Sequence, residues 1–161
     1  MHGNMGGWLE HKEIRGGARA MTKTSEAFDT LMRFYAAETA YLAPDGGDFS
    51  VIAETLDSDC VLFQPASLPY GGEWRGPAGF EACMKAFSEQ WSSLEVLDPQ
   101  FYPTDDVVVS HSHIRAVARA TGTAIDWPLL QLFRIRRGRI LELRPFHWDT
   151  AAMLPALRGE P

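Results

Sequence analysis

The run "ELRPFHWDTAA", residues 142–152, gathers several groups that could do chemistry at the end of a predicted strand. It holds a cation, an imidazole, a carboxylate and two aromatic rings, from Arg144, His147, Asp149, Phe146 and Trp148. An imidazole titrates near neutral pH, which suits a general base in proton transfer. A strand that served packing alone would use Val and Ile, which fit a pleated surface and leave no polar group unsatisfied. The run therefore predicts the rim or wall of a pocket.

Three residues of this run each allow more than one interpretation. His147 could be the proton-transfer group, or a buried histidine hydrogen-bonded to Tyr35 or to a backbone carbonyl. Asp149 precedes "TAAMLPAL", a short predicted helix, so we expect its carboxylate to cap that helix ahead of any acid-base role. Arg144 has the opposite strand parity from His147 and is expected on the outer face, paired with Glu142 or with a neighbouring subunit.

Two further groups are weaker candidates. "HSH" places His111 and His113 two residues apart on one strand face, a spacing that could bind a metal. No Cys, Asp or Glu is obviously poised to complete such a site, so we expect a solvated or core pair and no metal. Asp126 lies in a predicted loop that could line the mouth of the pocket, which makes it a second-choice acid.

The composition indicates one ordinary globular domain. The 161 residues are 45% hydrophobic and 22% charged, and a chain of this length can bury a core without disulfide bonds or metal ions to stabilise it. Lys and Arg number 15 against 21 Asp and Glu, and the net charge of −6 argues against a nucleic-acid partner. Cys60 and Cys83 are far apart in sequence and are expected to be free, buried thiols. No transmembrane-length stretch or signal-peptide core is evident, so we expect a cytoplasmic protein with no membrane role.

The spacing of apolar residues predicts the elements that must position these groups. Residues 1–22 are expected to form a flexible N-terminal extension, and residues 23–161 a single domain. Helices are predicted from Thr24 or Ser25 to Leu42, over 49–56, and from Pro77 to Trp91. Strands are predicted over 60–65, 94–102, 106–113, 114–121, 128–136 and 139–148. Whether 106–121 is one bent strand or two stays open. This order predicts an α+β fold: three N-terminal helices packed on a curved, mostly antiparallel sheet, enclosing a pocket, with a short C-terminal helix.

The order of elements, together with "FYAAETAYLAPDGGD", "EWRGPAGF" and "FRIRRGRILELRPFHWDTAA", resembles the nuclear transport factor 2-like superfamily. The nearest branch is the SnoaL-like polyketide cyclase group, which includes relatives of ketosteroid isomerase. The resemblance covers roughly residues 25–157 and implies a cone-shaped α+β domain. Such folds host isomerases, cyclases, dehydratases and non-catalytic binding modules, so the resemblance by itself implies no single reaction.

The resemblance also implies roles for particular residues. Tyr35 matches the helix tyrosine that donates a hydrogen bond to the developing enolate. Gln64 stands where the isomerases have their general-base aspartate, and Gln131 where they have a carboxylic acid held neutral. Because an amide cannot take up the proton, the resemblance implies that this is not a standard ketosteroid isomerase. By the same alignment and strand alternation, Gln131 and His147 face the inside of the cone.

Two functional hypotheses follow. In the first, the domain binds a small apolar or aromatic molecule that carries a carbonyl or hydroxyl group, and catalyses a cofactor-free isomerisation, cyclisation or dehydration. Tyr35 and Gln131 would polarise the oxygen, and His147 would move the proton. The other expected substrate-binding residues are Gln64, Phe63, Trp74, Phe133, Leu143 and Asp126. In the second hypothesis the domain is a non-catalytic ligand-binding or assembly module. In both, exposed aromatics of the last strand predict a homodimer through the outer sheet face.

Overall fold

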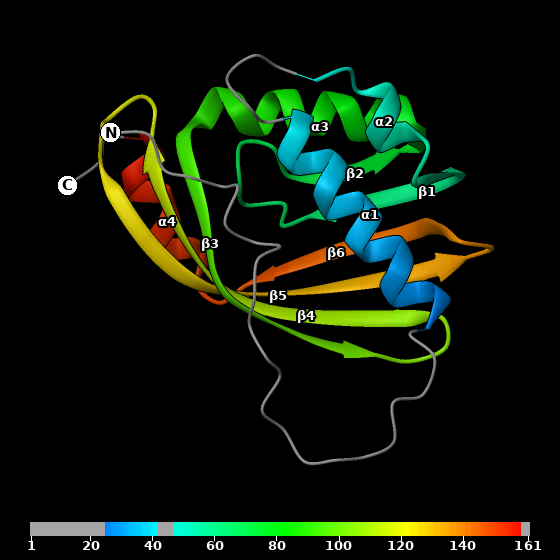
Figure 1. Cartoon of the computed structure of the whole chain (residues 1–161). Helices are drawn as coiled ribbons and strands as arrows, with labels where there is room; N and C mark the ends of the chain where they lie inside the picture. The colour runs from blue at the N-terminus through cyan, green and yellow to red at the C-terminus, as the bar shows by residue number, and fades with distance from the viewer. Residues whose placement is uncertain (1–24, 42–46, 159–161) are drawn as a thin grey trace, which may run out of the picture.

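The computed structural model of the chain describes residues 25–41 and 47–158 (Figure 1). In chain order its elements are α1 (Glu26–Tyr41), α2 (Ser50–Ala53), β1 (Leu56–Gln64), β2 (Gly72–Arg75), α3 (Gly76–Gln90), β3 (Trp91–Pro103), β4 (Val107–Ala118), β5 (Ala124–Arg136), β6 (Arg139–His147) and α4 (Thr150–Arg158). The predicted α+β class is confirmed, although α3 follows two strands. The expected N-terminal extension, residues 1–22, lies outside the described part of the chain.

Local signals account for where the main helices begin. The Ser25 hydroxyl accepts a hydrogen bond from the Phe28 N–H at 3.2 Å, so Ser25 caps α1 as predicted. Pro77 lies in the first turn of α3, where its missing N–H has no partner to lose. Asp149 Oδ1 accepts the N–H of Ala152 at 3.1 Å, which confirms the predicted cap of α4. No helix among the described residues is long and apolar enough to cross a membrane.

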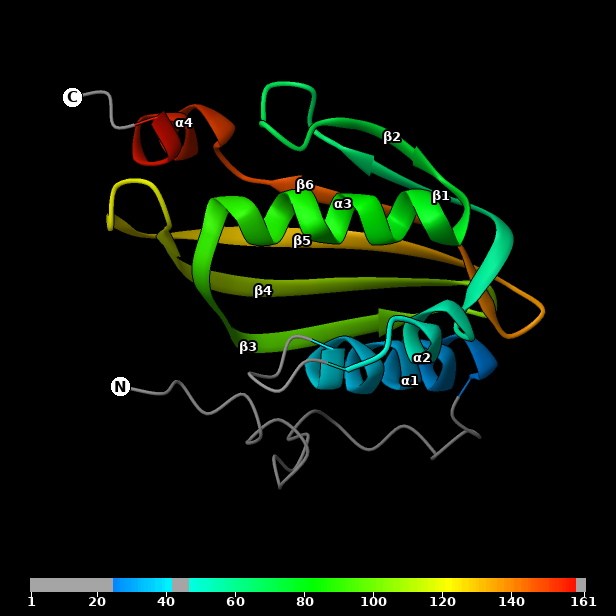
Figure 2. The ribbon, with the colours of Figure 1, turned by 90° about the horizontal axis from the view of Figure 1, so that it is seen from above.

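The six strands form one curved sheet in the order β2-β1-β6-β5-β4-β3. Every neighbouring pair is antiparallel except β1 and β6, which are parallel. Seen from above, α3 lies over the middle of the sheet and α1 runs beside it near β3 (Figure 2). We call the face covered by α1 and α3 the inner face and the opposite one the outer face. The helix α4 closes one end of the sheet (Figure 1).

Strand alternation decides which residues face inward. Along β4, the even-numbered residues from Val108 to Ala118 are buried, and the odd-numbered ones are partly or fully exposed. The strand register places Leu129 opposite His147, and Phe133 opposite Leu143. The register therefore places the two residues of each pair on the same face of the sheet.

The inner face carries two clusters of buried side chains. The α1 cluster lies beneath α1 and α3, and its largest members are Leu31, Phe34, Phe80, Phe133 and Leu143. The α4 cluster lies at the other end, around Tyr70, Trp91, Trp127, Met153 and Leu157. Full burial of such a side chain contributes about 1.5–3 kcal/mol relative to exposure, so both clusters hold the fold together.

Several predicted boundaries differ from the structure. Residues 107–118 form one continuous strand, because β4 pairs along its length with both β3 and β5. The first strand begins at Leu56, four residues earlier than predicted, and the predicted loop before α3 contains the short strand β2. The predicted tight turn after β5 is confirmed. Arg137 and Gly138 have φ values of 53° and 67°, the left-handed conformation that a type I′ hairpin turn requires.

Candidate functional site

A row of polar residues crosses the inner face within the α1 cluster. The strand register places Ser110 opposite Gln131, and Gln131 opposite Pro145. In β1, Leu62 lies opposite Leu143, so two residues further along the parallel pair Gln64 comes level with Pro145. We call Ser110, Gln131 and Gln64 the polar row. Ser110 and Gln131 thus lie side by side, and Pro145 separates Gln131 from Gln64, on a face that is otherwise largely apolar.

Tyr35 reaches from α1 to this row. Its hydroxyl lies 3.1 Å from Gln131 Oε1 and 3.2 Å from Ser110 Oγ, and the Ser110 hydroxyl lies 3.4 Å from Gln131 Oε1. Burial raises the pKa of Tyr35 well above its ordinary value, and the hydrogen bond with Ser110 opposes this only in part. Tyr35 is therefore a neutral hydrogen-bond donor at any physiological pH. Because Gln131 Oε1 accepts from these hydroxyls, the Gln131 amide N–H groups are left to meet another partner.

Gln64 contributes an acceptor without a donor. Its Oε1 atom is buried and has no hydrogen-bond partner among the residues that the structure describes. The amide lies beside the Cys83 thiol of α3. Burial raises the pKa of this thiol to about 12, although Gln64 has a smaller, lowering effect on it. A buried carbonyl oxygen left unpaired costs about 1–3 kcal/mol. Such an atom marks a place where a donor from outside the chain would be favourable.

Glu38 is the carboxyl group at this end of the inner face. It lies on α1 four residues after the fully buried Phe34, in line with Leu31 and Ala27. Burial raises the pKa of Glu38 to about 7. Among residues 25–41 and 47–158 no Lys, Arg or His lies within ion-pair distance of it. Near neutral pH this carboxyl group can therefore either accept or release a proton.

His147 occupies the next row along the sheet. Its Nδ1 atom accepts a hydrogen bond of 2.8 Å from the Trp127 indole N–H. Since an indole can only donate, Nδ1 carries no proton, and the neutral ring holds its proton on Nε2. Burial lowers the pKa of His147 to about 4, so the ring is neutral at physiological pH. The expected partner, Tyr35, is bonded to the polar row instead.

The remaining predicted residues divide between the two faces. Phe133 and Leu143 are buried in the α1 cluster, and Trp74 packs against it while its indole N–H donates to the Tyr70 carbonyl at 3.1 Å. Phe63 alternates with the inward Leu62, and so lies on the outer face. On this face the Arg144 guanidinium lies 3.7 Å from the Phe63 ring centroid and forms a hydrogen bond with Glu142. Asp126 lies 3.3 Å from His113 on the same face. The structure thus brings Tyr35, Gln131, Gln64, Phe133 and Leu143 together, and separates Phe63 and Asp126 from them.

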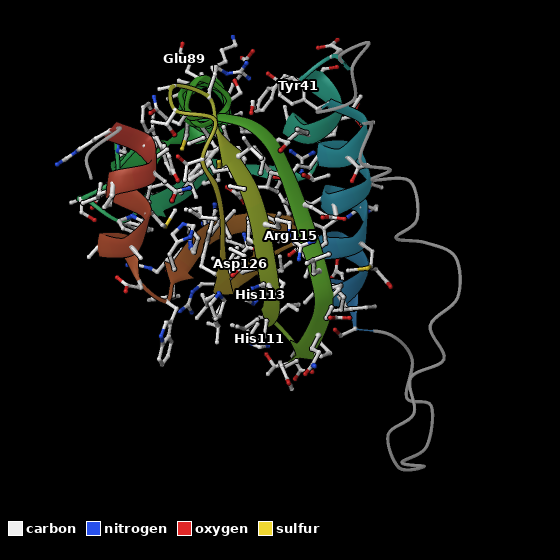
Figure 3. All side chains as sticks on the ribbon, turned by 90° about the vertical axis from the view of Figure 1, so that its left-hand side faces the viewer. Tyr41, Glu89, His111, His113, Arg115 and Asp126 are labelled. Carbon is white, nitrogen blue, oxygen red and sulfur yellow. The ribbon has the colours of Figure 1, made fainter. Side chains whose placement is uncertain are left out.

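The outer face carries its own polar groups. His111, His113 and Arg115 follow one another along β4, with Asp126 beside them on β5 (Figure 3). A hollow of about 540 Å³ lies between this part of the sheet and α4, lined by Arg115, Asp126, Trp148, Asp149 and others. It is separate from the polar row. No group of three or more His, Cys, Asp or Glu in the described residues is arranged to hold a metal ion.

The sequence of the chain matches a known protein family over most of the fold. A family model described as a SnoaL-like domain matches residues 31–143 of the chain. This chain belongs to the SnoaL-like domain family. The predicted membership of the nuclear transport factor 2-like superfamily is thereby confirmed. No curated protein matches the sequence.

Solved structures share the fold of this SnoaL-like domain. A nuclear transport factor 2-like protein of unknown function from Burkholderia pseudomallei is 20% identical with a TM-score of 0.71, over 83% of this chain and 98% of that one. A candidate SnoaL-like polyketide cyclase from Jannaschia sp. CCS1 is 21% identical with a TM-score of 0.72, over 91% and 100% of the two chains. TerC, co-crystallised with polyporic acid, is 18% identical with a TM-score of 0.69, over 83% and 98%. At these identities the similarity shows the fold alone.

Three residues of the SnoaL-like domain site were missed by reasoning from sequence. Glu38 carried a signal, because it continues the three-four spacing of Leu31 and Phe34 on the buried face of α1. Ser110 also carried one, since it alternates in phase with the apolar Val108. Cys83 was expected to be buried, but no local pattern predicts its position beside Gln64.

Proposed function

We propose that this SnoaL-like domain binds a small apolar or aromatic molecule with a carbonyl or hydroxyl group between α1, α3 and the inner face. The observation that carries the proposal is the unpaired, buried Oε1 of Gln64 in a row that also holds Gln131 and Ser110. A ligand hydroxyl could donate to Gln64, and a ligand oxygen could accept from the amide N–H of Gln131. The Tyr35 hydroxyl could donate to the same ligand oxygen by giving up its hydrogen bond to Gln131 Oε1.

The solvent access of the site residues supports an internal binding space. Tyr35, Glu38, Gln64 and Gln131 all face the inner side, yet each keeps partial solvent access. Their neighbours in the α1 cluster, such as Phe133, are almost fully buried. Side chains that are enclosed by protein and still accessible are typical of the walls of an internal space.

The apolar walls would come from Phe133, Leu143 and Trp74. These surround the polar row with carbon surface, the usual composition of a small-molecule site with a few placed polar groups. TerC, a protein of similar fold, has been crystallised with polyporic acid, which fits small-molecule binding in this fold. Phe63 and Asp126 lie on the outer face. A contact between these two residues and the ligand stays a prediction, and the proposed inner site does not require it.

If the domain is an enzyme, the site suits cofactor-free proton transfer on a carbonyl compound. Tyr35 and Gln131 would stabilise the negative charge that develops on the ligand oxygen. His147, neutral with its proton on Nε2, would donate a hydrogen bond from the neighbouring row. With Nδ1 occupied by Trp127, the imidazole supports orientation of the ligand better than removal of its proton.

A non-catalytic role is the second candidate. It is favoured by the amides of Gln64 and Gln131, which stand where the resembling isomerases have carboxyl groups. The domain would then hold its ligand without converting it. Ligand binding at the polar row is common to both candidates, so it is the property to test first.

We also propose a cytoplasmic homodimer that forms through the outer sheet face. Phe146, Leu130 and Trp148 are 52%, 39% and 82% exposed and lie at one end of β5 and β6. Exposed apolar side chains grouped in this way favour association. Sedimentation of the wild type and of Phe146→Glu would test this, and a monomeric wild type would exclude it.

A thermal-shift screen tests binding directly. Steroid ketones, polyketide-like aromatics with 2-naphthol as reference, terpenoids and small hydroxy acids would each be added to the purified chain. A ligand that binds only the folded state stabilises it, by about 2.7 kcal/mol at 100 times its Kd. Loss of the hydrogen bond in Tyr35→Phe should weaken binding about tenfold, or ~1.4 kcal/mol.

The matched control is Tyr102→Phe, because Tyr102 is 55% exposed and bonds only Gln100 on the outer part of β3. This variant should bind as tightly as the wild type. If none of the four classes raises the melting temperature, or if both variants weaken binding equally, the polar row is not the binding site.

A further inference from the structure

The buried face of α1 ends in a carboxyl group. Ala27, Leu31 and Phe34 are 0%, 0% and 1% exposed, and the same spacing of three and four residues continues to Glu38. This face packs against β4, β5 and β6. A helix that needed only a packing surface would place Leu or Met at this position, since a carboxylate in an apolar layer is unfavourable.

No charge of opposite sign compensates Glu38. By contrast, the carboxyl group of the buried Asp57 accepts two hydrogen bonds of 3.0 and 2.6 Å from Arg136. Glu38 has no such cation in the described residues. On α3, the charged side chains Glu81 and Lys85 pair with each other at 2.8 Å.

The other titratable groups of the inner face are uncharged at neutral pH. Burial raises the pKa values of Tyr70 and Cys83 to about 12 and of Cys60 to about 11, and it lowers that of His147 to about 4. Tyr35 is likewise neutral. Among these groups of the described residues, Glu38 is thus the one whose charge can change in the physiological range.

Glu38 and Tyr35 lie close to each other on α1. They lie three residues apart on one helix, the spacing that puts two side chains on one face about 5–6 Å apart at Cβ. The negative charge of Glu38 contributes to the raised pKa of the Tyr35 phenol, which shows that the two groups interact. The last residue of α1, Tyr41, interacts with Lys85 of α3, so this end of α1 lies against α3 and not at a free edge (Figure 3).

We propose that Glu38 is the catalytic proton carrier of this domain, acting on the carbon next to a ligand carbonyl whose oxygen is held by Tyr35 and Gln131. The inference rests on the proposed function, because it needs a ligand at the polar row. The Glu38 carboxylate takes a proton from the α-carbon, the C–H electron pair forms a carbon–carbon double bond, and the carbonyl electrons move onto oxygen. The carboxylic acid then returns the proton to the same or a conjugated carbon, so no co-reactant is needed.

The acidity of Glu38 suits this task. A general base works best with a pKa close to the working pH, and burial raises the pKa of Glu38 to about 7. The residue keeps partial solvent access, so its carboxyl group is not sealed off by the α1 cluster. This assignment also supplies the base that is missing at Gln64, without requiring the occupied Nδ1 of His147.

Hydrogen–deuterium exchange tests the proposal with one probe. The ketone 2-tetralone has acidic α-protons, and their loss in D₂O is followed by proton NMR in the presence of the wild type or of Glu38→Gln. We expect the wild type to accelerate exchange above the buffer rate and Glu38→Gln to lose about 100-fold or more of that acceleration. Exchange by the wild type should rise with pH around a midpoint near 7, and Glu38→Asp should retain a reduced rate with a shifted midpoint.

The controls separate this inference from the proposed function. Glu89→Gln removes a carboxylate from the exposed side of α3 and should leave exchange unchanged (Figure 3). Binding of 2-naphthol, an analogue of the enol, should stay within about threefold in Glu38→Gln. If 2-naphthol binds the wild type but 2-tetralone exchange is not accelerated, or persists in Glu38→Gln, Glu38 is not a proton carrier and binding stands. If 2-naphthol fails to bind the wild type, the proposed function fails as well.

Discussion

The two ends of the inner face differ in whether their polar atoms have hydrogen-bond or ion-pair partners. In the α4 cluster the indole N–H groups of Trp91 and Trp127 donate to the Tyr70 hydroxyl at 3.2 Å and to His147 Nδ1 at 2.8 Å. In the α1 cluster Gln64 Oε1 has no partner in the described chain, and Glu38 has no counter-charge. Both indoles at one end of the inner face therefore have acceptors, whereas a buried acceptor at the other end has no donor in the described chain.

This difference indicates a division of labour. Paired buried polar groups stabilise a unique packing, whereas unpaired ones reduce stability and are expected where a ligand supplies the missing partners. The aromatic network at α4 would hold the end of the sheet closed. The polar row at α1 would stay ready for a ligand, at the expense of some stability.

The largest expected effect is on stability, from Trp127→Ala in the α4 cluster. Trp127 is 4% exposed and packs on Trp91 with ring centroids 5.4 Å apart. Its loss leaves a cavity and an unpaired His147, so the free energy of unfolding should fall by about 3–5 kcal/mol. Denaturant unfolding measures this, with Trp148→Ala as control, because Trp148 is 82% exposed and should change stability by less than about 0.5 kcal/mol. Equal losses of stability in Trp127→Ala and Trp148→Ala would contradict this contrast between the two ends of the inner face.

The next largest expected effect is a difference in how the two ends contribute to stability as the pH changes. The pKa of Glu38 is raised to about 7, so the folded state holds this proton more tightly, and Glu38 lowers stability progressively as the pH rises from about 4.5 to 7. Glu38→Gln should therefore be more stable than the wild type by about 1–3 kcal/mol at pH 8, and nearly equal at pH 4.5. His147, whose pKa is lowered to about 4, behaves oppositely, because its stabilising neutral form is lost as the pH falls from 6.5 through 4.

Denaturant unfolding of the wild type, Glu38→Gln and His147→Gln between pH 4 and 8 would resolve the two contributions. His111→Gln is the control for the histidine, because His111 lies exposed on β4 (Figure 3). A Glu38→Gln variant whose stability parallels the wild type at every pH would mean that Glu38 is well solvated. It would then no longer distinguish the α1 cluster.

The smallest expected effect comes from Gln64→Leu. This change replaces an amide whose buried Oε1 has no partner in the described chain by an apolar group of similar size, so stability should stay level or rise by up to about 1 kcal/mol. Affinity for 2-naphthol should fall, because the acceptor for its hydroxyl is gone. A loss of stability above about 1 kcal/mol, measured by urea unfolding, would show that Gln64 has a structural partner and would weaken the contrast between the two ends.

Much of the fold could be predicted from local patterns. The cap at Ser25, the turn at Arg137 and Gly138, and the alternation along β5 and β6 depend on residues close in sequence, and all are confirmed. The continuity of β4 could not be predicted, because it depends on hydrogen bonding to β3 and β5 on either side. The short strand β2 forms only because β1 offers it an edge to pair with.

The sequence by itself determined which side chains share a face of a helix or strand, since helical and strand periods are local properties of the chain. That information already places Gln131 and His147 on one face, and it places Glu38 on the buried side of α1. Only the tertiary structure decided their partners. Tyr35 meets Gln131 across 96 residues, His147 meets Trp127 across 20, and Gln64 Oε1 meets no donor in the described chain. The helical or strand period determines the side of an element on which a side chain lies. A hydrogen bond also requires two atoms within about 3 Å, and that distance depends on how the helices pack on the sheet.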